Sequence, residues 1–353
     1  MMKKFTLTIL AAAVLGLTGC ATNLVRTDAE NSARAVQIEP DLHTVSRGDA
    51  EDADEVSLPQ NYNPDNYRKM VLQVLFYPND QENPDRFAKE KSEAVTSLFE
   101  TEITKLRRFT ILSSSQLGQQ ARRDVKRMQD KGGVPSDRVF RLGREKGAQY
   151  ALVGGIAIKS ERYNRLSNNE IFYIITVNYQ LINLETNEIE EADIAEGRAK
   201  RTFYATPNGA YVGGFNLNDP KQTQVALNEA SYRALKIIAN KIGNKFPVGG
   251  QVTGARGERV QVDAGYDQGL MGKQVGVLYT FDGVDIPLAY VELQPGKKST
   301  SGRVIRWNSD DEADDLIDKF KENGMAYLRD YPETYVVSKG MPTPPEWDKN
   351  YKN

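Results

Sequence analysis

The sequence predicts a mixed β-sheet with flanking helices, of the α+β or α/β class, followed by a small glycine-rich all-β domain that resembles a barrel. Short apolar runs alternate with stretches of helical period over residues 67–246. Over residues 247–331 the period becomes alternating, and glycines punctuate short strands. The 353-residue chain is 39% hydrophobic and 27% charged, with a net charge of -2, which is typical of a globular protein.

The larger domain, residues 67–246, has the predicted order β-α-β-α-α-β-β-β-α. Apolar runs predict its strands at residues 70–76, 109–112, 151–158, 171–184 and 189–204. Apolar residues three or four positions apart predict its helices at residues 87–106, 116–129, 137–146 and 220–242. A polar link over residues 159–170 precedes the fourth strand, and Asp219 and Pro220 supply the cap and first turn of the last helix.

The glycine-rich domain, residues 247–331, is predicted from alternating apolar residues. Its strands are expected at residues 259–263, 274–281, 288–293 and 303–307. A helix with acidic residues in its first turn, residues 311–322, and a last strand, residues 325–328, complete the domain. The proline-containing residues 332–353 predict an extended tail.

The start of the chain has the three parts of a secretory signal peptide. Lys3 and Lys4 form a positive head, residues 5–17 are apolar but too few to span a membrane, and small residues precede Cys20. The order Leu-Thr-Gly-Cys resembles the bacterial lipobox, which implies that residues 1–19 are removed. The alternative is an ordinary signal peptide with a chance cysteine.

By this resemblance, Cys20 carries acyl chains such as palmitate, which would hold the protein durably in a membrane. Ala21, rather than an aspartate, follows the cysteine. By resemblance to the Gram-negative sorting rule, this implies attachment to the outer membrane on its periplasmic side. Residues 20–66 are poor in large apolar side chains and predict a flexible tether, with docking of part of it on a neighbour as the alternative.

Several kinds of chemistry are excluded by the residue counts. The chain has one histidine, His43, in the predicted tether, and one cysteine, Cys20. We therefore expect neither a Ser-His-Asp site nor a His-bearing metal cluster, and no cofactor or small-molecule substrate. Lys297 and Lys298 follow a glycine, but the pattern favours a hairpin turn over a phosphate loop. The near-neutral charge argues against nucleic-acid binding.

Two features are candidates for partner binding. One predicted helix carries a basic face, which could meet an acidic partner or anionic headgroups or could simply be solvated. Trp347 in the predicted tail could anchor a partner, since aromatic side chains are enriched in interface hot spots, or could lie in a disordered end. The basic face consists of Arg122, Arg123, Lys126 and Arg127.

Two stretches of the larger domain carry a family resemblance. Residues 147–156 read Gly-Ala followed by an apolar strand with glycines near its end, and residues 177–183 form a long strand before a turn that contains Thr186. With the closing helix, they resemble the CsgG superfamily, which includes curli-secretion lipoproteins and LpoB-type synthase activators and is related to the TolB amino-terminal domain. Residues 250–272 are similar to the carboxy-terminal β domain of the FlgT family.

The resemblance implies a non-enzymatic accessory lipoprotein that binds protein partners in a secretion, flagellar or peptidoglycan-synthesis machine. The first alternative is an oligomeric, curli-type secretion channel. Against it, residues 159–170 are too short and too charged for a membrane hairpin, and residues 192–215 lack an apolar face. The second alternative is a cell-wall hydrolase that depends on carboxylates, although no pair of carboxylates stands out.

Overall fold

The computed structural model describes residues 46–64, 67, 69–79, 86–113, 147–164, 169–205 and 211–348. Several predictions lie outside these residues: the signal peptide, the lipidated Cys20, and the helices at 116–129 and 137–146 with Arg122, Arg123, Lys126 and Arg127. None of the helices within the described ranges combines the length and the apolar character that crossing a membrane requires.

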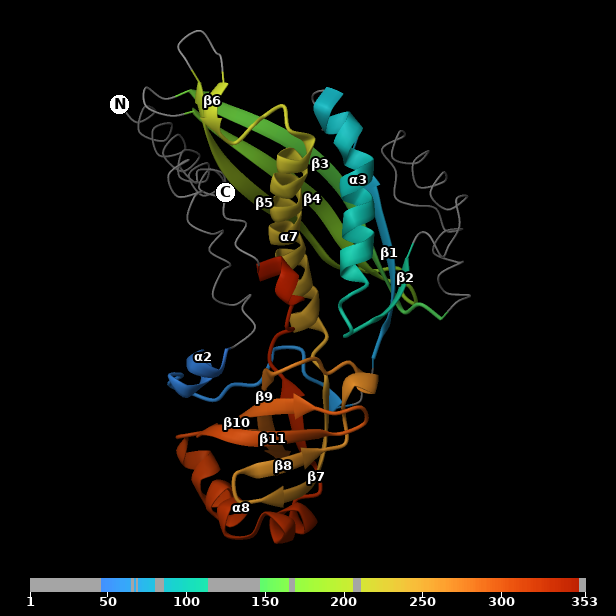
Figure 1. Cartoon of the computed structure of the whole chain (residues 1–353). Helices are drawn as coiled ribbons and strands as arrows, with labels where there is room; N and C mark the ends of the chain where they lie inside the picture. The colour runs from blue at the N-terminus through green and yellow to red at the C-terminus, as the bar shows by residue number, and fades with distance from the viewer. Residues whose placement is uncertain are drawn as a thin grey trace, which may run out of the picture. The chain divides into compact units, whose positions relative to one another are not determined.

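A six-stranded mixed sheet forms the larger domain, which confirms the predicted mixed sheet and adds one strand, at residues 211–214, to the five predicted (Figure 1). Its order is β2-β1-β3-β4-β5-β6. Strand β1 pairs in parallel with β2 and β3, and the remaining neighbours are antiparallel. The strands are β1 (Val71–Pro78), β2 (Thr110–Ser113), β3 (Tyr150–Asn164), β4 (Asn169–Asn183), β5 (Ile189–Ala205) and β6 (Tyr211–Gly214).

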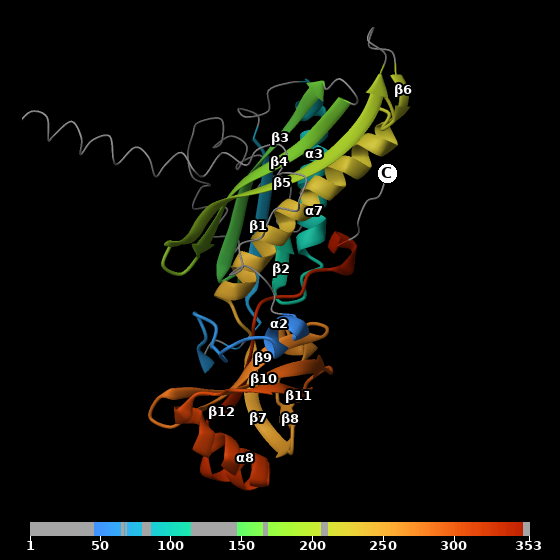
Figure 2. The same cartoon turned by 90° about the vertical axis from the view of Figure 1, so that its left-hand side faces the viewer.

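Two helices, α3 (Arg86–Ile103) and α7 (Pro220–Lys245), cover one face of this sheet (Figure 2). Helix α7 begins where the sequence predicts, because the side chain of Asp219 accepts a hydrogen bond from the backbone of Lys221 and a proline occupies the first turn. The core between helices and sheet is fully buried and aliphatic or aromatic. Its members include Val95, Phe99, Ile156, Ile175, Val177, Leu227, Leu235 and Ile238.

The predicted polar link over residues 159–170 is wrong for most of its length, because β3 runs to Asn164 and β4 starts at Asn169. The pairing continues without interruption, with Lys159 opposite Ile174 and Glu161 opposite Phe172. Polar residues are compatible with a strand when they point away from the helices, so charge alone does not mark a loop here.

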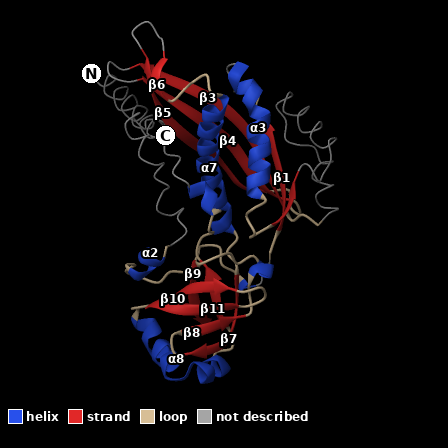
Figure 3. Ribbon diagram, viewed as in Figure 1, coloured by secondary structure: helices blue, strands red, loops and turns tan. Residues whose placement is uncertain are grey.

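A closed barrel forms the second domain, which confirms the predicted barrel-like fold (Figure 3). Its order is β10-β11-β8-β7-β12-β9. The predicted hairpin turn at Lys297 and Lys298 is confirmed between two of its strands. The strands are β7 (Gly249–Arg256), β8 (Arg259–Val262), β9 (Gln274–Phe281), β10 (Asp285–Pro295), β11 (Thr300–Trp307) and β12 (Thr334–Ser338), with a short helix η4 (Tyr266–Gln268).

Two predictions for the end of the chain are wrong. The segment predicted as a last strand, residues 325–328, belongs to helix α8 (Asp311–Asp330), which continues past a non-helical Asn323. It does so because Tyr327 packs its ring 5.1 Å from that of Phe320. The predicted tail contains β12, which closes the barrel by pairing with both β7 and β9.

Residues 46–64, which we call the strap, lie against the barrel instead of forming a flexible tether, so the docking alternative holds for this part of residues 20–66. Helix α2 (Arg47–Glu51) buries Ala50 completely in a cluster with barrel residues such as Tyr279. The Tyr62 hydroxyl donates a 2.7 Å hydrogen bond to Asp285. Partial burial and this bond raise the pKa of Tyr62 to about 12, so the phenol remains a donor at neutral pH.

We expect the Ala50→Asp substitution to detach the strap, because it would place a carboxylate at a fully buried position among the apolar and aromatic side chains of the cluster. Limited proteolysis and hydrogen exchange should show residues 46–62 exchanging at least ten times faster, while the barrel strands stay protected. Asp54→Ala, at an exposed position of the same segment, should leave the exchange unchanged. Equal exchange in both variants would mean that the packing of Ala50 does not hold the strap.

Candidate functional site

The face of the sheet opposite α3 and α7 is the first candidate surface. Within the described residues, both helices that pack on this sheet contribute to one shared core, on the side of Ile175 and Val177. Alternation along the strands places the other set of side chains on the opposite side. This set, which we call the open face, is exposed at Tyr163, Ile194 and Tyr204 but buried at Glu170, Phe172 and Ile174. Its other members are Lys159, Glu161, Glu196, Arg198 and Lys200.

Charges on the open face pair with one another. Lys200 Nζ lies 2.5 Å from Glu170 Oε1, and Lys159 is paired with Glu161. The bond from Lys159 holds the pKa of the Glu161 carboxyl below its usual value. The Tyr163 hydroxyl donates a 2.8 Å hydrogen bond to the same carboxylate. The charged residues of this face therefore largely neutralise one another before any partner arrives.

Apolar and aromatic side chains rise between these pairs. Ile194 is 61% exposed, Tyr204 50% and Tyr163 40%. The Tyr163 ring also meets Phe172 edge-on at 5.4 Å, so it is held in place. Exposed aromatic and aliphatic groups over neutralised charges are typical of protein-binding surfaces, where desolvating unpaired charge would cost affinity. The open face is thus suited to a protein partner.

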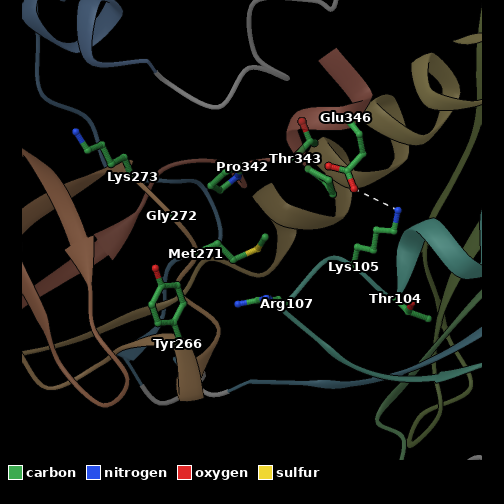
Figure 4. Close-up of a pocket in the computed structure, with 11 residues that line it drawn as sticks. Thr104, Lys105, Arg107, Tyr266, Met271, Gly272, Lys273, Pro342, Thr343 and Glu346 are labelled. Carbon is green, nitrogen blue, oxygen red and sulfur yellow. Dashed lines mark hydrogen bonds and ion pairs between the residues drawn. The ribbon is translucent and has the colours of Figure 1, made fainter. Parts of the chain in front are cut away.

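A pocket of about 650 Å³ is the second candidate site (Figure 4). We call it the junction pocket, because three separate parts of the chain line it: the turn after α3, η4 with the loop that follows it, and the segment after β12. Three cationic side chains and one carboxylate lie among its lining residues, together with apolar groups. The lining comprises Thr104, Lys105, Arg107, Tyr266, Met271, Gly272, Lys273, Pro342, Thr343, Pro344 and Glu346.

Arg108 ties the three parts of the junction pocket together. Its guanidinium is buried and donates hydrogen bonds to the carbonyl oxygens of Phe246, at 2.6 Å, and Gly340, at 3.0 Å, and to Ser338 Oγ, at 3.1 Å. Gly269, in the left-handed region with a φ of 103°, lies so close that a Cβ would come within 2.8 Å of the Arg108 carbonyl oxygen. These contacts fix the segments that carry Met271 and Pro342.

Burial lowers the pKa of Arg108 to about 9, so the guanidinium keeps its charge at pH 7. Among the described residues, its Nε atom has no hydrogen-bond acceptor and no carboxylate pairs with the group. Sequence reasoning missed this residue, since a single arginine before a short strand has no pattern that separates a buried guanidinium from a solvated one. The three acceptors that bind the Arg108 guanidinium come together only in the folded chain.

Trp347 does not lie in an extended tail, so that prediction is wrong. The side chain is 3% exposed, and its Nε1 donates a 2.8 Å hydrogen bond to Glu102 Oε2. The indole also stacks on Tyr232 of α7, with 6.3 Å between ring centroids. Burial of the large indole together with this hydrogen bond stabilises the folded state more than exposure of the side chain to solvent would. A role for Trp347 in partner binding stays a prediction.

Comparison with known proteins gives one family match. Residues 91–195 match the family described as peptidoglycan-synthase activator LpoB. No curated protein matches the chain. The predicted resemblance to an accessory lipoprotein family is therefore confirmed for this stretch, whereas the resemblances to CsgG and FlgT stay predictions.

Three of the solved structures to which the chain is similar are the following. Lipoprotein GNA1162 from Neisseria meningitidis is 12% identical, with a TM-score of 0.27 over 50% of this chain and 99% of that one. The PelC dodecamer from Paraburkholderia phytofirmans is 14% identical, with a TM-score of 0.23 over 53% and 92%. The LpoB carboxy-terminal domain from Salmonella enterica is 19% identical, with a TM-score of 0.19 over 36% and 82%.

Proposed function

We propose that this protein is a lipoprotein of the outer membrane, anchored through Cys20 and facing the periplasm, that acts as a non-enzymatic accessory protein of a peptidoglycan synthase. The family match over residues 91–195 is the observation that carries this proposal. An accessory protein of this kind acts by binding. By binding the active conformation of its partner more tightly than the inactive one, it shifts the partner toward activity.

The open face is the surface through which we expect the partner to bind. The matched residues include the whole of β3 and β4 and the first part of β5, which carry most of this face. Ile194 is the most exposed large apolar residue among the described residues of the matched stretch and lies beside the neutralised charges. Buried at an interface, such a side chain can act as a hot spot whose loss weakens binding strongly.

The test is the Ile194→Glu substitution, which places a charge at the most exposed apolar position of the open face. The full-length protein in detergent should lose at least tenfold in affinity for a purified peptidoglycan synthase, about 1.4 kcal/mol, and should no longer raise the rate of glycan polymerisation. Pull-down from solubilised envelopes gives the same comparison in a native mixture.

Val225→Glu is the matched control. Val225 is an exposed aliphatic residue, 42% accessible, on α7, which packs on the other face of the sheet. The control should bind and activate the synthase as the unchanged protein does. If both variants bind equally well, the open face is not the contact. If neither the unchanged protein nor the variants bind any synthase, the proposed function is wrong.

A further inference from the structure

We propose that the junction pocket binds an acidic peptide segment of a protein partner, with Arg107 as the residue that receives the carboxylate. The pocket is separate from the open face, and this inference does not depend on the proposed function. A volume of about 650 Å³ falls within the range of about 300–1,000 Å³ typical of ligand sites, which suits the end or a short stretch of a chain.

Two of the three cationic side chains that line the pocket have no ion-pair partner among the described residues. Lys105 is already paired, with Glu102 at 2.6 Å and with Glu346 at 3.2 Å. Arg107 and Lys273, by contrast, form no ion pair with any residue of the described ranges. The one carboxylate that lines the pocket is thus engaged by Lys105, and two cations remain for a ligand.

Arg107 is placed to receive the carboxylate of a ligand. In Figure 4 its guanidinium extends toward Tyr266 and Met271, while the ammonium of Lys273 points outward at the rim. A guanidinium presents two parallel donors to a carboxylate, and the adjacent phenol of Tyr266 can supply a third. The buried charge of Arg108, the next residue along, adds to the positive potential of this region because no carboxylate in the described part of the chain pairs with it.

The apolar part of the lining favours a peptide over a small inorganic anion. Met271, Pro342 and Pro344 line the pocket beside the cations. An aliphatic side chain next to a carboxylate would bury surface against them, whereas phosphate would gain nothing there. Residues 342–344 adopt no helix or strand and form one wall of the pocket, so an extended peptide can lie along them.

The experiment uses the full-length protein in detergent and two short peptides. The probe is an acetylated Glu-Leu-Glu peptide, and the matched peptide is the acetylated, amidated Gln-Leu-Gln, which keeps the shape and loses the charge. Calorimetry or fluorescence anisotropy should show binding of the acidic peptide at least tenfold tighter than that of the neutral one. A higher salt concentration should weaken the binding of the acidic peptide and leave that of the neutral peptide unchanged.

The Arg107→Glu variant should lose at least tenfold in affinity for the acidic peptide. Arg259→Glu, at an exposed arginine on strand β8 of the barrel, should bind it unchanged, which shows that loss of any one surface cation is not enough. Circular dichroism and thermal unfolding check that both variants are folded. The Ile194→Glu variant should also bind the peptide normally, so failure of the open face and failure of the pocket are distinguishable.

Three outcomes would overturn this inference. Equal binding of the two peptides would show that no carboxylate is recognised. Inorganic phosphate that competes as well as the acidic peptide would reduce the pocket to a general anion site. Tighter binding of a soluble muropeptide, or of vesicles containing phosphatidylglycerol, would assign the pocket to the cell wall or the membrane instead of a protein.

Discussion

Replacement of Arg108 by alanine should lower the free energy of unfolding by about 3 kcal/mol. The substitution removes the donors that satisfy the carbonyl oxygens of Phe246 and Gly340, and these acceptors would remain buried without partners. It also leaves a cavity where a long side chain was enclosed. Urea unfolding, followed by circular dichroism, measures the effect as a lower midpoint at an unchanged slope.

The neighbouring Arg107→Ala provides the control, because this side chain is exposed and makes no ion pair among the described residues. It should change stability by no more than about 0.5 kcal/mol. An Arg108→Lys variant should fall between the two, since an ammonium restores a charge and some donors but lacks the planar fork. Equal midpoints for Arg108→Ala and Arg107→Ala would show that the buried hydrogen bonds contribute no net stability.

Replacement of Gly197 by alanine should destabilise the larger domain by about 3 kcal/mol. A Cβ at this position would lie 1.9 Å from the carbonyl oxygen of Ala230 and 2.6 Å from the backbone nitrogen of Ala234. Both contacts are with helical backbone, which cannot move aside as the end of a side chain would. Helix α7 must therefore shift away from β5, and thermal unfolding should show a lower midpoint.

Gly213→Ala is the matched control, because a Cβ there meets nothing within 4 Å. Its φ angle is also outside the left-handed region, so the backbone accepts alanine without strain. This variant should unfold at nearly the same temperature as the unchanged protein. A large loss in both variants would point to a general cost of removing glycine from this sheet rather than to the close approach of α7.

The parts of the fold that could be predicted are those whose signal is local. Strand β1 follows from a near-continuous apolar run, and α7 follows from its cap at Asp219 and its apolar period. The wrong predictions fall where the same residues are compatible with two kinds of secondary structure. Residues 325–328 are compatible with a short strand, yet tertiary packing of Tyr327 on Phe320 keeps them helical.

Barrel closure and the junction pocket could not be predicted because they depend on contacts between distant residues. Strand β12 lies among prolines and looks like a tail, but Val336 pairs with Gly250 and Leu278, from two other strands. The buried position of Arg108 likewise depends on hydrogen-bond acceptors that lie more than a hundred residues away in the sequence. The strap fits the same account, since a few apolar residues suffice once the barrel offers a surface to receive them.

Docking of the strap has a consequence for how far the protein can work from its proposed point of attachment. Counting from Cys20, 26 residues precede Ser46, so this leash can span no more than about 90 Å between the anchor and the strap. With the strap released, the leash would run to the first strand of the sheet at Val71, 51 residues from Cys20, and its maximum would roughly double. Attachment of one short segment to the barrel thus limits the distance at which a partner can be met.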